Sequence, residues 1–224
     1  KDGLSHNTVY CSLQDQKGFM WFGTDDGLNR FDGYSFRVFR YNSMEKPEKS
    51  LINDRIISFM EDSSGKIWIC TGGGVCYYDY ETDSFHPFMP DSQSSPYFSE
   101  QLYEDKNGDL WLRDRVNITR YNKKTDLFKT YNSNNYGFRS VTMTMTEEGI
   151  PVFADASSLF VYHPDSDHFN RLLSMEGFRK NDRTVIMTVK EVPQVGFFIG
   201  TDLEGLLFYH ADSGVLETVI PEMY

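Results

Sequence analysis

The sequence contains no uninterrupted run of 18 apolar residues, and it therefore predicts no transmembrane helix. It also lacks an apolar stripe at the helical period of 3.6 residues, which argues against a helical bundle. Basic residues are few, because 22 Lys and Arg stand against 33 Asp and Glu, a formal net charge of −11. Such a surface repels phosphate backbones and anionic lipids. We therefore expect no nucleic-acid partner, and membrane contact only through parts of the protein outside this chain.

Cysteine is also scarce. Cys11, Cys70 and Cys76 form no C-x-x-C pair, and no His stands at metal-ligand spacing from them, so the sequence predicts no metal site and no cofactor. Cys70 and Cys76 flank the glycines at 72–74, and a hairpin there could bring the two thiols together as a disulfide. The simpler interpretation is that they are small buried thiols in strands.

Aromatic residues and a long repeat are what the sequence has in quantity. Aromatics make up 16% of the chain, which favours strands. The clearest copy of the repeat runs from Asp15 through Gly18 and Trp21 to Phe36; the next two copies are strong and the last two are weak. The Trp position falls at residues 21, 68, 111, 152 and 198, at intervals of 47, 43, 41 and 46 residues. A period near 45 is typical of a propeller blade.

Each copy contains four short β-rich runs, which in the first copy cover residues 9–13, 20–23, 28–31 and 36–39. The Asp-x-x-Gly corner between the first two runs supplies a carboxylate for backbone amides and a glycine that tolerates positive φ. Continuous apolar runs such as 67–69 predict strands covered on both faces, as between propeller blades. We therefore predict an all-β propeller segment spanning 1–224, with about five four-stranded blades at 8–39, 55–88, 97–131, 139–172 and 184–220.

The residues from Gly18 to Gly33, which include Trp21 and Asp32, resemble the two-component regulator propeller repeat, and Gly3 to Val9 is similar to that family's lead-in to a first blade. The resemblance implies the amino-terminal, periplasmic sensor propeller of a Bacteroidetes hybrid two-component system, in an inner-membrane protein that also carries a histidine kinase. It further implies detection of glycan-derived oligosaccharides and a seven-bladed propeller, of which five blades fit here.

A candidate ligand-binding rim follows from the blade order. If the first strand of each blade is innermost, the loops between second and third strands share one rim with the loops between blades. Aromatic rings there can stack on sugars, and polar groups can bond sugar hydroxyls. The alternative is that these are ordinary exposed loop residues. The rim residues are Asp25, Asp26, Asn53, Arg55, Tyr97, Arg113, Arg115, Tyr136, Arg139, Asp155, Arg183, Asp202 and Glu204.

No catalytic constellation is predicted. His163 and His210 occupy the repeat position of Asp32, a blade apart, so they cannot converge on one substrate. The neighbouring carboxylates of Asp25 and Asp26 lie on one turn, whereas a glycosidase needs two on opposite sides of a sugar. The leading hypothesis is a non-enzymatic sensor that binds an oligosaccharide. The alternative is a scaffold for protein contact or dimerisation without its own small-molecule site.

The chain ends suggest how the segment associates. The chain begins without Met, and we interpret it as a piece of a longer protein. The first copy starts with its own first run, and the fifth ends with its own fourth run, so neither end offers a strand to the other. An incomplete ring would expose the apolar flanks of its terminal blades. We therefore expect self-association, or contact with remaining blades, through these flanks.

Overall fold

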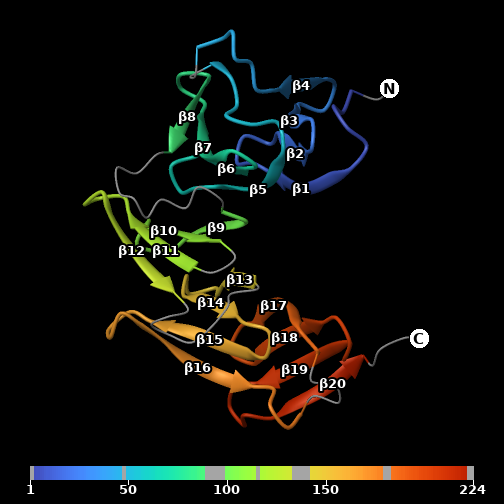
Figure 1. Cartoon of the computed structure of the whole chain (residues 1–224), viewed down its shortest axis with the longest axis vertical. Helices are drawn as coiled ribbons and strands as arrows, with labels where there is room; N and C mark the ends of the chain where they lie inside the picture. The colour runs from blue at the N-terminus through green and yellow to red at the C-terminus, as the bar shows by residue number, and fades with distance from the viewer. Residues whose placement is uncertain are drawn as a thin grey trace. The chain divides into compact units, whose positions relative to one another are not determined.

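The computed structural model describes residues 3–46, 49–88, 99–114, 117–132, 142–178 and 183–220. Within these residues the strands form five four-stranded sheets, and strands that are neighbours in a sheet are also consecutive in sequence (Figure 1). The prediction of an all-β chain of about five four-stranded units is confirmed. Two compact units follow one another along the chain, Lys1–Glu104 and Asp105–Tyr224.

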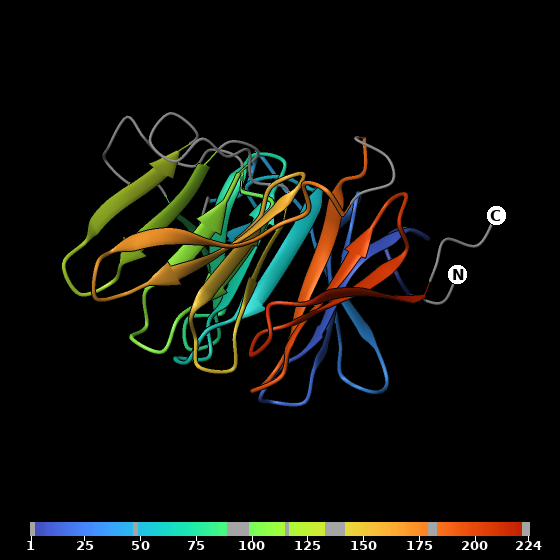
Figure 2. The same cartoon turned by 90° about the horizontal axis from the view of Figure 1, so that it is seen from below.

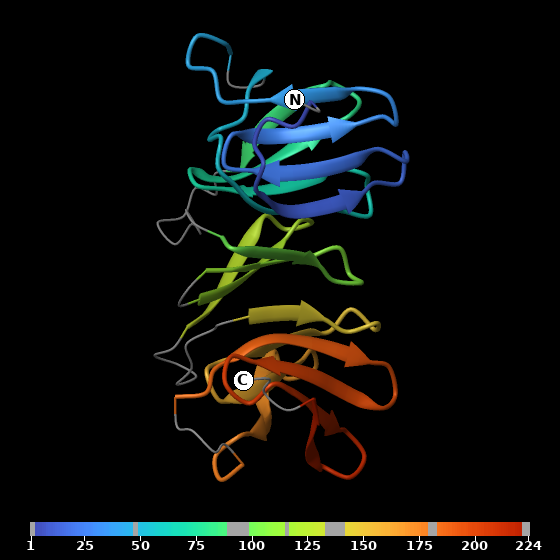
Figure 3. The ribbon, with the colours of Figure 1, turned by 90° about the vertical axis from the view of Figure 1, so that its right-hand side faces the viewer.

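The first unit contains two complete sheets and one strand of the third. The first sheet consists of β1 (Val9–Gln14), β2 (Met20–Thr24), β3 (Gly27–Phe31) and β4 (Phe36–Phe39), the blue antiparallel arrows of Figure 3. These bounds match the four predicted runs to within one residue. The remaining strands of the unit are β5 (Ile56–Glu61), β6 (Ile67–Thr71), β7 (Gly74–Asp79), β8 (Ser84–Phe88) and β9 (Gln101–Glu104).

The second unit holds the other strands of the third sheet and two complete sheets. The third sheet continues with β10 (Leu110–Arg113), β11 (Asn117–Asn122) and β12 (Leu127–Asn132). The fourth consists of β13 (Thr142–Met145), β14 (Pro151–Ala154), β15 (Ser158–His163) and β16 (His168–Ser174). The fifth, orange to red in Figure 2, consists of β17 (Ile186–Val192), β18 (Gly196–Thr201), β19 (Leu206–His210) and β20 (Leu216–Ile220).

A buried aspartate organises the first hairpin of three sheets. Asp15 Oδ1 accepts hydrogen bonds from the backbone N–H groups of Lys17 and Phe19, at 3.0 and 2.9 Å, as the corner motif predicted. Its Oδ2 accepts the indole Nε1–H of Trp21 at 2.6 Å, a bond that the corner motif did not predict. The other aspartate–tryptophan pairs are Asp62–Trp68 at 2.8 Å and Asp105–Trp111 at 2.9 Å.

The two weak copies lack both members of this pair. The fourth copy has Thr146 and Val152 at the two positions, and the fifth has Val192 and Phe198. Thr146 Oγ1 still accepts the N–H of Ile150, at 2.9 Å. A buried indole N–H needs an acceptor, whereas Val and Phe do not, so the aspartate and the tryptophan are replaced together. This joint replacement was the signal in the sequence for the indole bond.

A second repeated contact joins neighbouring sheets. The glutamate at or next to the end of the first strand of one sheet accepts the first corner N–H of the preceding sheet. The three bonds are Gln16 N to Glu61 at 2.9 Å, Ser63 N to Glu104 at 2.6 Å, and Glu147 N to Glu191 at 2.6 Å. Each bond involves a carboxylate, which makes it stronger than a bond between neutral groups.

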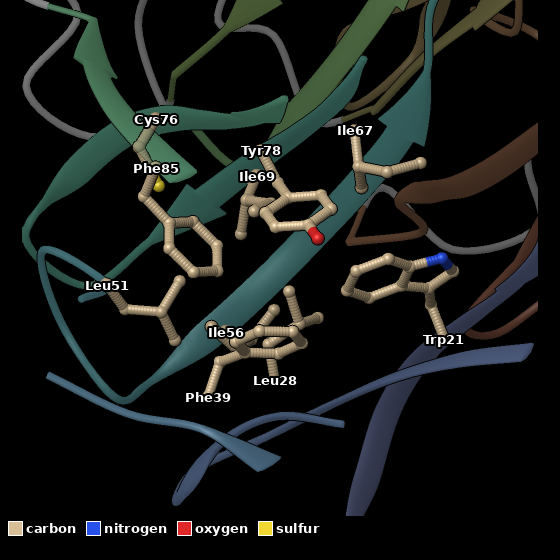
Figure 4. Close-up of a cluster of buried hydrophobic side chains, with 10 residues drawn as sticks. All are labelled: Trp21, Leu28, Phe39, Leu51, Ile56, Ile67, Ile69, Cys76, Tyr78 and Phe85. Carbon is tan, nitrogen blue, oxygen red and sulfur yellow. The ribbon is translucent and has the colours of Figure 1, made fainter. Parts of the chain in front are cut away.

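The core of the first unit lies between its first two sheets (Figure 4). Trp21 is fully buried, and its ring centre lies 5.8 Å from that of Phe39 and 5.5 Å from that of Tyr78. Every residue of β6 is buried, as expected for a strand covered on both faces. The apolar run at 67–69 therefore indicated its environment correctly.

Cys70 and Cys76 are buried free thiols, and Cys11 is a partly buried free thiol. The simpler interpretation of these residues is confirmed, and the disulfide between Cys70 and Cys76 is not formed. Burial raises the pKa of the Cys76 thiol to about 12, so this group is a neutral, unreactive thiol at neutral pH.

An aspartate in the β15–β16 turn connects the third and fourth sheets within the second unit. Asp167 has a φ of 49°, a conformation that Asp and Asn tolerate better than most residues. Its carboxylate accepts hydrogen bonds from Tyr162 Oη at 2.6 Å, from Tyr131 Oη and from Lys129 Nζ. Burial alone would raise the pKa of Asp167, but these bonds outweigh burial and lower it to about 2.

This carboxylate predicts an acid-sensitive second unit. Its folded pKa of about 2 lies below the model-peptide value of about 3.9, so its contribution is complete above about pH 4 and is lost as the pH falls towards 2. We expect D167N to remove about 1 kcal/mol at pH 7, once screening of the half-exposed side chain is allowed for, and almost nothing at pH 2. Thermal unfolding between pH 2 and 7 measures this, with exposed D212N as the control. An equal loss for D167N at both pH values would contradict the assignment.

Candidate functional site

The rim residues of the first unit begin at the β2–β3 turn. Thr24 Oγ1 accepts the N–H of Asp26 at 3.0 Å and donates to the carbonyl of Gly27 at 2.9 Å. Gly27 has a φ of +111°, which a residue with a side chain rarely adopts. These bonds hold the turn, which presents two consecutive carboxylates, those of Asp25 and Asp26.

Asp25 lies between an aromatic ring and a guanidinium group. Its Oδ2 accepts the hydroxyl of Tyr10 at 2.6 Å, and its Oδ1 lies 3.5 Å from Nε of Arg55. The hydrogen bond to Asp25 raises the pKa of Tyr10. The side chain of Arg55 is 67% exposed, and half of Tyr10 is exposed, so both remain accessible to a ligand.

Asp26 pairs with a different arginine. Arg40 donates from Nε and Nη2 to the two carboxylate oxygens of Asp26, at 3.1 and 2.9 Å. The bond from Arg40 holds the pKa of Asp26 below its usual value. The two parallel N–H donors of Arg40 match the two carboxylate oxygens, which fixes the orientation of the guanidinium group.

The loop before β5 connects this turn to the β6–β7 turn. The carbonyl of Asp54 accepts the N–H of Gly27, and the carbonyl of Arg55 accepts the N–H of Gly72, both at 2.8 Å. Asn53 Oδ1 accepts the N–H of Arg55 at 2.9 Å. A Cβ at Gly72 would lie 2.9 Å from Asn53 Oδ1, so a side chain there would displace the amide of Asn53. Asn53 therefore shapes the loop, while Arg55 projects from it.

We call Tyr10, Asp25, Asp26, Arg40 and Arg55 the rim cluster. Three of its five members, Asp25, Asp26 and Arg55, were predicted from the sequence, whereas Tyr10, in strand β1, and Arg40, directly after β4, were not. The sequence itself shows only that they stand close to the ends of predicted strands, a position that many residues share.

The predicted rim residues of the second unit differ from this arrangement. Arg113 and Glu204 are 5% and 9% exposed, so they are buried and not on an open rim. Glu204 accepts a bond from the Thr184 hydroxyl at 3.1 Å, and Asp202 accepts one from the N–H of Val185 at 2.7 Å. These contacts hold residues 184 and 185, directly before β17, against the β18–β19 turn.

Asp155 closes its own turn, because Oδ1 accepts the N–H groups of Ser157 and Ser158 at 2.8 and 2.6 Å. Arg183 is exposed. The remaining four predicted rim residues lie outside the described residues: Tyr97, Arg115, Tyr136 and Arg139.

The described parts of the chain bring together no group of three or more His, Cys, Asp or Glu that could hold a metal ion. Nor do they include a helix long and apolar enough to cross a membrane. His163 and His210 lie at the ends of β15 and β19, and His210 Nε2 lies 3.0 Å from Glu217 Oε1.

Comparison with solved structures shows that the chain has a β-propeller fold. It superposes on the extracellular domain of a protein described as a hybrid two-component system of B. thetaiotaomicron with a TM-score of 0.60 and 19% identity, over all of this chain and 36% of that one. It also superposes on an inactive H270A virginiamycin B lyase of Staphylococcus aureus with a TM-score of 0.68 and 14% identity, over 98% of this chain and 74% of that one. At these identities the likeness concerns the fold, which carries different functions in different proteins.

The repeats provide a second comparison. Two segments, residues 3–26 and 50–73, match the sequence profile described as the two-component regulator propeller repeat. A stretch of 41 residues is also 51% identical to histidine kinase P4 of Formosa agariphila, covering 18% of this chain and 3% of the kinase. The chain therefore spans a small part of this relative, and about a third of the two-component extracellular domain.

Proposed function

We propose that this chain is a segment of the extracytoplasmic sensor propeller of a hybrid two-component regulator, on the periplasmic side of an inner-membrane histidine kinase. The observation that carries the proposal is the coincidence of repeats and fold: both profile matches fall on the first hairpins of four-stranded sheets, at 3–26 and 50–73. The identity to a histidine kinase supports it. The reading frame that encodes the chain tests it, because a frame without export signal, membrane span and kinase would overturn it.

The rim cluster supports oligosaccharide binding by this segment. It combines an exposed phenol ring with two carboxylates and two guanidinium groups on one turn and its neighbouring strands. Sugar rings have apolar faces that stack on aromatic side chains, and their hydroxyls bond charged groups. Arg55 contacts Asp25 at 3.5 Å only, beyond an ordinary charge-assisted bond, so its N–H donors can turn to a ligand.

A titration of the chain with neutral, acidic and sulfated oligosaccharides tests this role. We expect at least one to bind with saturable heat in isothermal titration calorimetry. R55M and D25N should each weaken it about tenfold or more, since a hydrogen bond to a charged group contributes roughly 1.5–3 kcal/mol. R171M and D212N are matched controls at exposed positions of the second unit, and they should bind like the parent. Equal affinity of R55M and the parent would remove the rim cluster from the site.

A protein-contact role is the second candidate, favoured by the fifth sheet. Four apolar side chains of this sheet and its turns are 45–55% exposed: Met187 and Val219 in strands, and Val195 and Val215 in the turns before β18 and β20. An exposed apolar surface of this kind is typical of a contact with further protein. Absence of saturable heat with every sugar, together with concentration-dependent mass in light scattering, would favour this second function over the first.

A further inference from the structure

A cleft of about 460 Å³ lies in the first unit, beside the corners of its first two sheets. The corners precede β2 and β6, whereas the rim cluster follows β2, so the cleft is at the other end of these strands. Its volume is within the range of about 300–1,000 Å³ that ligand sites occupy. The charged and aromatic side chains that line the cleft are Lys17, Glu61, Lys66, Asp79, Tyr80 and Glu81.

Two walls of the cleft are fixed before any ligand arrives. The hydroxyl of Tyr80 donates to the buried carboxylate of Asp15, and its ring meets that of Tyr78 edge-on, with centres 5.0 Å apart. Glu61 accepts the N–H of Gln16 at 2.9 Å. Walls held in this way cost a ligand little ordering entropy on binding.

The cleft is lined by charged groups of both signs. Lys17 Nζ lies 5.0 Å from the centre of the Tyr80 ring. Lys66 Nζ lies 3.9 Å from Asp79 Oδ2, beyond hydrogen-bond distance, so its N–H donors are not used up by that carboxylate. Glu61 takes one backbone N–H through Oε2, and a carboxylate has four acceptor positions in total. Donors and acceptors are therefore both presented to the same space.

This lining selects by charge and by hydrogen-bonding type. Its two ammonium groups face three carboxylates, in a chain of net charge −11, so a free anion is disfavoured. A hydroxyl group both donates and accepts hydrogen bonds, so it can bridge an ammonium and a carboxylate. A ligand with several adjacent hydroxyls and no charge fits this pattern best.

We propose that the cleft is a second binding site, for one or two residues of a neutral sugar whose hydroxyls donate to Glu61 and Glu81 and accept from Lys17 and Lys66. The choice of a sugar rests on the proposed sensor function, while the position and the neutrality rest on the cleft itself. The rim cluster and the cleft are then separate sites at the two ends of the same strands.

Calorimetric titration of the chain with maltose, cellobiose and lactose tests the proposal, with glucuronic acid and glucose 6-sulfate as anionic probes. We expect a neutral disaccharide to bind, and the double variant K66M/E81Q to bind it at least tenfold more weakly. The control K190M/E148Q makes the same changes at exposed positions of the second unit and should bind like the parent. Unchanged circular dichroism of both variants excludes misfolding as the cause.

Three results would overturn the proposal: no binding of any neutral disaccharide, equal affinity in K66M/E81Q and the parent, or preferred binding of the anionic probes to the cleft. The rim variant R55M distinguishes a failure of the cleft proposal from a failure of the proposed sensor function. If R55M alone abolishes sugar binding, the rim function stands and the cleft proposal falls. If K66M/E81Q alone abolishes it, the cleft holds the sugar.

Discussion

Trp111→Ala is expected to destabilise the second unit by about 3–5 kcal/mol, the cost of removing a large core aromatic. Trp111 has no exposed surface, and its ring centre lies 4.7 Å from that of Tyr162 and 5.7 Å from that of Tyr131. The substitution removes these contacts and also deprives the buried Asp105 of the indole donor at 2.9 Å. Few single changes in the unit combine a cavity with a lost charged hydrogen bond.

Urea unfolding followed by far-ultraviolet circular dichroism measures this loss, because the substitution removes one of only three tryptophans as fluorescent probes. Trp111→Phe keeps most of the apolar volume and loses only the N–H, so it should cost less, about 1–3 kcal/mol. Leu127→Ala, at a side chain that is 67% exposed, is the control and should change little. An unchanged midpoint for Trp111→Ala would contradict the buried position of this ring.

Asp15→Ala is expected to cost the first unit about 3–5 kcal/mol, in the range seen when one partner of a buried charged network is removed. Asp15 is 4% exposed and accepts four hydrogen bonds. Two of them come from the indole of Trp21 and the hydroxyl of Tyr80. The alanine leaves the buried indole N–H of Trp21 without an acceptor, at a cost of about 1–3 kcal/mol, and the partly buried hydroxyl of Tyr80 without its partner.

The fourth copy of the repeat suggests the decisive comparison, because it carries Thr and Val where Asp and Trp stand in the first. We expect the double variant D15T/W21V to lose less stability than the sum of D15T and W21V, by about 1–3 kcal/mol. Because the Val side chain has no N–H group, removing the carboxylate in the W21V background leaves one fewer donor without an acceptor. Exposed Glu45→Ala is the control in urea unfolding. Strict additivity of the two single variants would show that the indole bond contributes nothing.

Much of the fold followed from local patterns. The four runs of the first copy correspond to β1–β4 because alternating turn and β-branched or aromatic residues fix both the ends and the type of a strand. The aspartate of the corner was predicted to bond backbone amides, and it does so within five residues of sequence. Hydrogen bonds between residues so close in sequence depend on the local conformation of the chain and little on the side chains that pack against it.

The candidate site could be predicted from the sequence much less completely than the fold. Asp25 and Arg55 were both predicted for one rim, and the structure brings them to 3.5 Å, but Tyr10, which donates to Asp25 from strand β1, was not predicted. Arg113 and Glu204 were placed on the same rim by their position in the repeat and are instead buried. A repeat position fixes the place of a backbone atom, whereas exposure depends on the side chains of adjacent loops.

The sequence by itself determined the strands, the corner motif and the repeat, because each depends on residues that are near one another along the chain. Only the tertiary structure decided which side chains from different sheets meet. The bond from Gln16 to Glu61 spans 45 residues, and the cleft combines two corners with the β7–β8 turn. Such contacts are set by the packing of one sheet on the next, which local sequence constrains only through volume and polarity.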